Sequence, residues 1–355
     1  AVTVLKNSAV LLLFLLFISC GTKNKEYANN VFPYSQFPQE KELKGEVIEL
    51  DTALFRYPFR IRIEGDKAIV LDLHGSDYYG HLFQYPSFRY LSSFGRRGDS
   101  PLEMLSMENF RLHNHTLWTL DANKSELTRL DFSSSGDSLL REETVALDED
   151  ILRPLDFAIY NDTTFVIPDY SGESRFLKVD CKGKLIEKIG TIPTTNKKAL
   201  QEARPALAQA WRSFLDYNSH NSVLATVTQL GEVVEIYNLK DSTHVIRVGE
   251  YDEPEFKVSD GYGIPTGIMG FSDVQVTDDA IYAVFHGTSF KDIARQSGRL
   301  SDGGKYIYVF SLKGEPLCKY VLDHYIYGIW VDEVTKTIMA TDVNNDQPIL
   351  KFSFG

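Results

Sequence analysis

The sequence predicts an all-β protein, a six-bladed β-propeller built from four-stranded antiparallel blades. Three observations lead to this fold class. The 355 residues include 22 Phe and 19 Tyr but only 4 Met, and aromatic side chains are favoured on the pleated surface of strands. A pattern of short strands separated by polar turns recurs six times. One strand pattern stands in surplus before the first repeat, and the last repeat lacks its fourth strand.

The repeated unit is clearest at residues 109–132, NFRLHNHTLWTLDANKSELTRLDF. Apolar residues alternate within its strand patterns, and Asn, Asp, Lys and Ser lie between them, as in short antiparallel strands joined by tight turns. The second strand of the unit recurs at intervals of 47 to 60 residues. Its copies begin at Asp66, Asn114, Asn161, Asn221, Asp278 and Thr335.

The two ends of the repeat array complement each other. A strand pattern near Val47 precedes the first unit, and the sequence ends at Gly355 before a fourth strand of the sixth unit. We expect the N-terminal strand to complete the last blade and close a ring, because radial closure removes exposed sheet edges. A linear solenoid would instead leave both ends open and need caps.

The N-terminal segment has the pattern of an export signal. Lys6 precedes a ten-residue apolar run at 9–18, which is too short to span a bilayer. Ser19-Cys20-Gly21 then resembles the lipobox of bacterial lipoproteins, and this resemblance implies cleavage before Cys20 and a lipid on its thiol. The alternative is an ordinary signal peptide with a chance cysteine. We expect a signal peptide at 1–19, a polar lipid-anchored tether at 20–45 and the propeller at 46–355.

The formal net charge of −12 restricts the partners. Such a surface repels phosphate backbones and anionic headgroups, so we expect no nucleic-acid partner and no membrane contact beyond the lipid on Cys20. Together these features predict a monomeric outer-membrane lipoprotein of the cell envelope, periplasmic or surface-facing. The remaining cysteines, Cys181 and Cys318, are expected to be free.

Two insertions interrupt the repeat. Residues 196–211 have the composition of a short helix, interrupted near Pro205. Residues 286–304 form a long polar segment between the second and third strands of the fifth unit. A loop of this length on a rigid scaffold is either a recognition element or a solvated excursion without a role.

One motif resembles a known family. Residues 94–103, FGRRGDSPLE, resemble the turn between blades in TolB-like (NHL-like) six-bladed propellers of exported Gram-negative lipoproteins. Gly95, Gly98, Pro101 and Glu103 match that pattern, and Ser100 replaces its second glycine. The resemblance implies the propeller fold over residues 46–355. It implies no single activity, since propellers of this shape carry many functions.

Acidic and amide side chains recur at one position of the repeat. Five residues before the second strands stand Ile61, Asn109, Asp156, Asp216, Asp273 and Trp330. Equivalent innermost positions face the central channel of a propeller, so we expect a ligand-binding set there of Asn109, Asp156, Asp216, Asp273 and Trp330. The oxygens of Asn109, Asp156, Asp216 and Asp273 also suit calcium. Alternatively, each Asp or Asn only ends a loop before a strand, and a register error of one residue turns its side chain away.

A second acidic set follows the second strands. Asp121, Asp169 and Asp342 each begin a run in which every second residue carries a side-chain oxygen. The runs resemble the start of a calcium loop, but the glycine at its sixth position and its distal glutamate are missing. We expect these residues to form turns.

The sequence contains no GxSxG, HExxH, P-loop or paired CxxC motif. We therefore predict a binding or scaffold module that recognises an envelope protein or a glycan-type ligand at one face of the ring, without catalysis. The alternative is a calcium-dependent hydrolase or lactonase that uses the channel acids, an arrangement that six-bladed lactonases resemble. A third possibility is a structural spacer in an envelope assembly.

Overall fold

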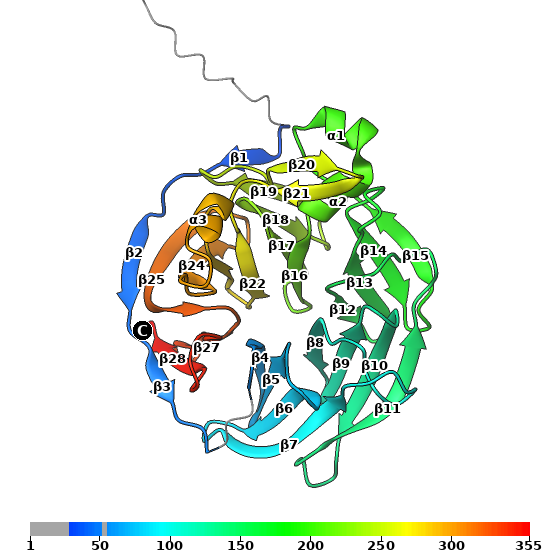
Figure 1. Cartoon of the computed structure of the whole chain (residues 1–355), viewed down its shortest axis with the longest axis vertical. Coiled ribbons are helices and arrows are strands. Elements are labelled where there is room, and N and C mark those ends of the chain that lie inside the picture. The colour runs from blue at the N-terminus through cyan, green and yellow to red at the C-terminus, as the bar shows by residue number, and fades with distance from the viewer. Residues whose placement is uncertain (1–27, 52–54) are drawn as a thin grey trace, which may run out of the picture.

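The computed structural model describes residues 28–51 and 55–355. They form six β-sheets arranged radially around a channel, and one separate two-stranded sheet (Figure 1). The first strands of neighbouring sheets contact one another around the ring. Blade 1 consists of β4 (Pro58–Glu64), β5 (Lys67–Asp72), β6 (Tyr78–Gln84) and β7 (Arg89–Arg96). Blade 2 consists of β8 (Asn109–His113), β9 (Thr116–Asp121), β10 (Glu126–Phe132) and β11 (Leu139–Ala146). Blade 3 consists of β12 (Ala158–Asn161), β13 (Thr164–Pro168), β14 (Phe176–Asp180) and β15 (Leu185–Ile189).

The other three blades follow the same order from the channel outward. Blade 4 consists of β16 (Ser213–Asn218), β17 (Val223–Thr228), β18 (Val233–Asn238) and β19 (Thr243–Val248). Blade 5 consists of β22 (Phe271–Val276), β23 (Ala280–Phe285), β24 (Gly304–Ser311) and β25 (Pro316–Ile326). Blade 6 consists of β26 (Ile329–Asp332), β27 (Thr337–Thr341) and β28 (Ile349–Ser353) with β3 (Glu46–Ile48). The predicted all-β, six-bladed propeller is confirmed.

The fourth strand of blade 6 comes from the N-terminal part of the described chain. β3 pairs antiparallel with β28, with Ile48 opposite Ile349 and Val47 opposite Leu350. This pairing joins residues about 300 positions apart in the sequence to one sheet and covers the edge that β28 would otherwise expose.

Residues 31–43, assigned to a tether from the sequence, form two further strands on the ring. β1 (Val31–Pro33) pairs parallel with β19 of blade 4, and β2 (Gln39–Leu43) pairs parallel with β25 of blade 5 (Figure 1). We call residues 31–43 the strap. The polar sequence of β2 is compatible with pairing because an outermost strand leaves most side chains in solvent, and Leu43 alone is buried within β2.

The predicted signal peptide and Cys20 lie outside the described residues. Within the described ranges, no helix is both long and apolar enough to cross a bilayer. Cys181 and Cys318 are free, as expected.

Hydrophobic cores lie between neighbouring blades. Phe59 of blade 1 packs with Phe110 and Leu117 of blade 2, whereas Ile61 packs with Met339 of blade 6. Each second strand is therefore covered on both faces, and every residue of β17 is buried. This packing explains why the second strands are nearly continuous apolar runs, and it makes the ring a rigid support for its loops.

The insertion at 196–211 is helical and is broken where the sequence predicts. α1 (Lys197–Glu202) ends at Ala203, and α2 (Arg204–Ala210) carries Pro205 in its first turn, where the missing N–H costs no helical hydrogen bond. A hairpin of β20 (Phe256–Ser259) and β21 (Tyr262–Pro265) packs on α2, and the Gly263 N–H donates to Gln209 Oε1 at 2.9 Å. The insertion beginning at residue 286 contains the short helix α3 (Phe290–Arg295).

The motif at 94–103 is the connection from blade 1 to blade 2. Gly95 has φ +69°, in the left-handed region that favours glycine. The Arg97 guanidinium donates to the carbonyls of Leu73 and Gly75 at 3.1 and 2.9 Å, and it lies 4.4 Å from the centroid of the Tyr79 ring. These contacts hold the start of the connection against blade 1.

Candidate functional site

The channel side chains predicted from the repeat lie at different depths. Asn109 stands four residues before the end of β8, but Asp216 and Trp330 stand only two residues before the ends of β16 and β26. Two residues of strand correspond to about 7 Å. Asp156 precedes β12, and Ile61 faces the core between blades 1 and 6 instead of the channel. The offset of five residues fails because the hairpin turns differ in length, and a shift of one residue reverses the side chain.

The acidic and amide side chains of this set join each blade to the next. Their shared feature is a hydrogen bond to the following blade, either to its innermost strand or to the segment just before that strand. Asn109 Nδ2 donates to Asp156 Oδ1 (2.6 Å), and Asp156 Oδ2, Asp216 Oδ2 and Asp273 Oδ2 accept the backbone N–H groups of Leu215 (2.9 Å), Val276 (2.7 Å) and Ile329 (2.9 Å). These contacts fix the innermost strands of blades 2 to 6 relative to one another.

Two arginines that the sequence analysis does not single out complete this network. Arg111 of β8 reaches across the channel, and its Nη1 and Nη2 lie 2.9 Å from Asp216 Oδ1 and 3.2 Å from Asp156 Oδ1. Arg62 of β4 pairs with Asp273 Oδ1 at 3.3 Å. Each arginine stands two residues before the end of its strand. An alignment of the repeats on the ends of the first strands, rather than on the starts of the second strands, would have placed these two arginines at equivalent positions.

Burial and the arginines act in opposite directions on the channel carboxyls. Burial raises the pKa of Asp216, against the opposing effect of Arg111 and Arg62. Burial would also raise the pKa of Asp273, but Arg62 and Arg60 outweigh it and hold this pKa below its ordinary value. Asp273 is therefore ionised and paired at neutral pH, and the centre of the channel is an ion-pair network.

This network does not fit a calcium site. A calcium ion needs several oxygens directed at one point, but the oxygens of Asp156, Asp216 and Asp273 are directed at N–H groups and guanidinium groups. Over residues 28–51 and 55–355, no group of three or more His, Cys, Asp or Glu side chains is placed to hold a metal ion. The calcium hypothesis stays a prediction without support from this geometry.

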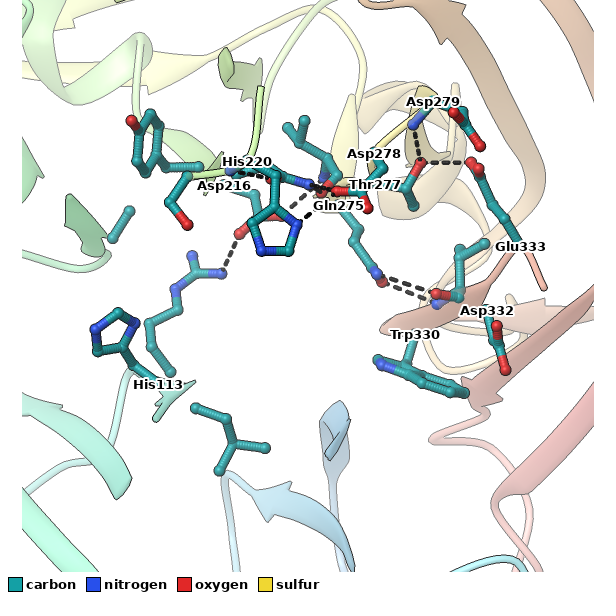
Figure 2. Close-up of a pocket in the computed structure, with 18 of the residues that line it drawn as sticks. His113, Asp216, His220, Gln275, Thr277, Asp278, Asp279, Trp330, Asp332 and Glu333 are labelled. Atoms are coloured by element: carbon teal, nitrogen blue, oxygen red, sulfur yellow. Dashed lines mark hydrogen bonds and ion pairs between the residues drawn. The ribbon is translucent and has the colours of Figure 1, made fainter. Parts of the chain in front are cut away.

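A cavity of about 460 Å³ opens at the end of the channel where the first and second strands of the blades are joined. We call it the mouth cavity. Of the predicted set, only Asp216 and Trp330 line it, together with Arg111. Figure 2 shows Trp330 and His113 on opposite sides of the opening, with Asp216 and His220 along a third side. Gln275 is held in place by the backbone of Val331, at 2.9 and 3.2 Å.

The rim of the mouth cavity is acidic. Asp278, Asp279, Asp332 and Glu333 come from the hairpins of blades 5 and 6. Asp278 Oδ1 accepts a hydrogen bond from Asn218 Nδ2 (3.0 Å) and lies 3.1 Å from His220 Nδ1. The hydrogen bond from Asn218 lowers the pKa of Asp278, so this carboxylate is ionised at neutral pH.

Glu333 is the partly buried acid of this rim. It accepts hydrogen bonds from Thr277 and, at 3.0 Å, from Tyr282. Burial and the adjacent carboxyl of Asp279 both raise its pKa. The rim therefore combines an ionised carboxylate, a carboxyl of raised pKa, imidazole groups and one indole face, and it can both donate and accept hydrogen bonds.

The second acidic set forms turns, as expected. Asp121 Oδ1 accepts the N–H groups of Asn123 (3.1 Å) and Lys124 (3.0 Å). In the same way, Asp169 Oδ1 and Asp342 Oδ1 each accept the backbone N–H group of the residue two positions later in the sequence. Asp121 Oδ2 also accepts the Leu105 N–H, which belongs to the connection from blade 1. These carboxylates stabilise the loops between second and third strands.

The family described as TolB-like 6-blade propeller-like matches residues 36–334. The chain belongs to this family. The match covers five blades and most of the channel, and it agrees with the resemblance carried by residues 94–103. No functionally curated protein matches the sequence.

Three of the solved structures similar to this TolB-like propeller come from species of Bacteroides. A protein of Bacteroides fragilis described as exported has 13% identity and a TM-score of 0.58, over 91% of this chain and 98% of that one. A duf4221 family member from Bacteroides vulgatus has 9% identity and a TM-score of 0.55, over 89% and 96%. An auxiliary nutrient binding protein of Bacteroides ovatus has 10% identity and a TM-score of 0.52, over 84% and 70%. At these identities the likeness concerns the fold.

Proposed function

We propose that the protein is an exported, lipid-anchored binding module that holds a glycan-type ligand in the mouth cavity. The observation that carries the proposal is the lining of this cavity. It combines one aromatic side chain, Trp330, with a rim of carboxylate, amide and imidazole groups. Its volume of about 460 Å³ lies within the range of small-ligand sites, about 300 to 1,000 Å³.

A sugar ring matches this lining better than other small ligands. Its hydroxyl groups can donate to Asp278 and Asp332 and accept from His113 or His220. Its apolar C–H face can pack on the partly buried indole of Trp330, which makes an edge-to-face contact with Tyr85 with ring centroids 5.8 Å apart. A phosphorylated or otherwise anionic ligand would meet repulsion from the acidic rim.

A folded protein partner is the other ligand class considered from the sequence. A stable protein interface buries about 800 Å² on each partner around an apolar centre. The exposed apolar side chain at this end of the channel is Val334, and the rest of the rim described here is polar. This difference favours the glycan.

The proposed cellular location rests on the N-terminal sequence. The lipobox-like Ser19-Cys20-Gly21 supports export and lipid attachment at Cys20, and residues 1–19 would be the cleaved signal. The structural likeness to a protein described as exported and to a nutrient-binding protein agrees with a role at the cell envelope. A binding propeller on a short lipid anchor would act close to the membrane surface.

The test is a glycan array probed with the purified protein and three variants. We expect binding of a defined glycan class, and a loss of at least about tenfold in affinity for Trp330→Ala and for Asp278→Asn, since each loses a contact of about 1.4 kcal/mol. Asp241→Asn is the matched control, because Asp241 is also exposed and also accepts hydrogen bonds, but it does not line the mouth cavity.

Circular dichroism must show that each variant remains folded. If no glycan binds, or if Asp241→Asn weakens binding as much as Asp278→Asn, the mouth cavity is not a glycan site. If envelope extract instead yields a protein whose capture is lost in Trp330→Ala, the site binds a protein and the glycan proposal is wrong.

A further inference from the structure

A second cavity lies between blades 4 and 5, beneath the strap. Its volume is about 480 Å³, and it shares no lining residue with the mouth cavity. We call it the strap cavity. Strap residues 34–37 form one side, and carboxylate and aromatic side chains of blades 4 and 5 form the others.

The strap is anchored firmly over this cavity. Between β1 and β2, Phe37 packs against Tyr34, Tyr308 and Phe310, with ring centroids 5.6, 4.7 and 5.6 Å away. Parallel pairing with β19 holds one end of the strap, and pairing with β25 holds the other. The strap is therefore held in a fixed position over the cavity between blades 4 and 5.

The lining is rich in carboxylate groups and tyrosine rings. Glu40, Glu232 and Glu250 all line the cavity, and Lys319 is the one lysine among its lining residues. The Lys319 ammonium lies 3.9 Å from Glu40 Oε2 and 4.6 Å from the centroid of the Tyr306 ring. The protein thus already places one ammonium against a carboxylate and an aromatic face at this site, which is the pairing that amines favour.

Glu232 and Tyr34 are buried polar groups that face the cavity. Their exposed fractions are only 4% and 9%. The Tyr34 hydroxyl points at Glu232 but makes no hydrogen bond of normal geometry within the described chain. Burial and the nearby Glu250 raise the pKa of Glu232 to about 7, against the lowering effect of Lys319. A buried carboxylate and an unsatisfied hydroxyl together favour a ligand that brings positive charge and hydrogen-bond donors.

We propose that the strap cavity binds a small organic cation carrying a primary amine. Its ammonium group would donate to Glu232 and Glu250. An anionic ligand would meet three glutamates, and a neutral ligand would leave Glu232 without a counter-charge. This inference does not depend on the proposed glycan site.

The proposal has a pH dependence with a definite sign. An ammonium selects the ionised form of Glu232, whose population rises from about 10% at pH 6 to about 90% at pH 8 for a pKa of about 7. We therefore expect affinity to rise about tenfold over this range. The other charged and titratable groups that line this cavity come from the strap, from the segment after β19 and from blade 5: Tyr34, Glu40, Glu250, Tyr251, His286, Tyr306, Tyr308 and Lys319.

The test is calorimetric titration of the purified protein with putrescine, with 1,4-butanediol as its neutral counterpart, in about 0.15 M NaCl to screen surface charge. We expect saturable binding of putrescine and none of butanediol. Glu232→Gln should lower the affinity for putrescine at least tenfold, and Tyr34→Phe should lower it severalfold. Hydrogen exchange should show that putrescine protects the backbone of residues 31–43.

Asp241→Asn is the matched control, because it removes one acidic group that lines neither the strap cavity nor the mouth cavity. Equal loss of affinity in Asp241→Asn and Glu232→Gln would mean non-specific attraction to an acidic protein and would overturn the proposal. Absence of saturable binding, equal binding of butanediol, or affinity that does not change between pH 6 and pH 8 would also overturn it.

Discussion

Replacement of Glu232 by glutamine is expected to make the protein more stable at alkaline pH. Glu232 is 4% exposed, and burial raises its pKa from 4.5 to about 7. A carboxyl with a higher pKa in the folded than in the unfolded state binds more protons when folded. Its contribution to stability is therefore fully present below the unfolded pKa and is lost as pH rises through about 7.

The magnitude follows from the two pKa values. The rise from 4.5 to about 7 corresponds to about 3 kcal/mol of unfolding free energy. About 2.5 kcal/mol of this falls between pH 5 and pH 8. Glu232→Gln keeps the shape of the side chain but removes its titration, so the variant should gain about 2.5 kcal/mol relative to wild type over this interval.

Urea unfolding followed by tryptophan fluorescence at pH 5 and pH 8 measures this difference. Comparison of variant with wild type at each pH cancels the other titrating groups. Glu250→Gln is the control, because Glu250 lines the same cavity but is exposed. If the difference between Glu232→Gln and wild type is the same at both pH values, Glu232 is ionised in the folded protein at pH 5, and the argument from burial is wrong.

Three further predictions concern the channel and the strap. Arg111→Met should lower the unfolding free energy by about 3 to 5 kcal/mol in chemical denaturation, because it leaves the buried charges of Asp156 and Asp216 uncompensated. A loss of unfolding free energy below about 1 kcal/mol would contradict the ion-pair network. Asp273→Asn should lower the unfolding free energy at pH 7, and this loss relative to wild type should shrink as pH falls below about 4. The reason is that the lowered pKa of Asp273 adds stability only where the unfolded carboxyl is also ionised. A loss of unfolding free energy that does not change with pH in acid titration would contradict this prediction. Phe37→Ala should cost about 2 to 4 kcal/mol and speed hydrogen exchange in residues 31–43, since it removes three ring contacts; unchanged exchange would mean that pairing alone holds the strap.

The blades could be predicted from the sequence because their signals are local. Alternation within residues 109–132 and the turn residues that bound its strands appear in the structure as β8, β9 and β10. The helix interrupted near Pro205 was equally accessible, since the effect of proline on a helix acts within one turn.

The strap and the channel register could not be predicted in this way. The sequence of β2, Gln39–Leu43, has four exposed residues of five, so no apolar alternation marks it as a strand. Its partner β25 lies almost 280 residues away. In the channel, Ile61 was aligned with Asn109, but β5 begins one residue after Asp66 whereas β9 begins two residues after Asn114. This shift of one residue turns the Ile61 side chain into the core between blades.

By itself the sequence determined the number of blades, their strand order and the acidic surface, because period-two patterning and composition are properties of short segments. Only the tertiary structure decided which side chains meet. Arg62 and Asp273 are separated by 211 residues, and Arg111 and Asp216 by 105. Such pairs form only when the ring brings its first strands together, since one strand cannot hold both partners. The same closure placed the strap over Glu232 and left Asp216 and Trp330, alone among the predicted channel residues, at the mouth.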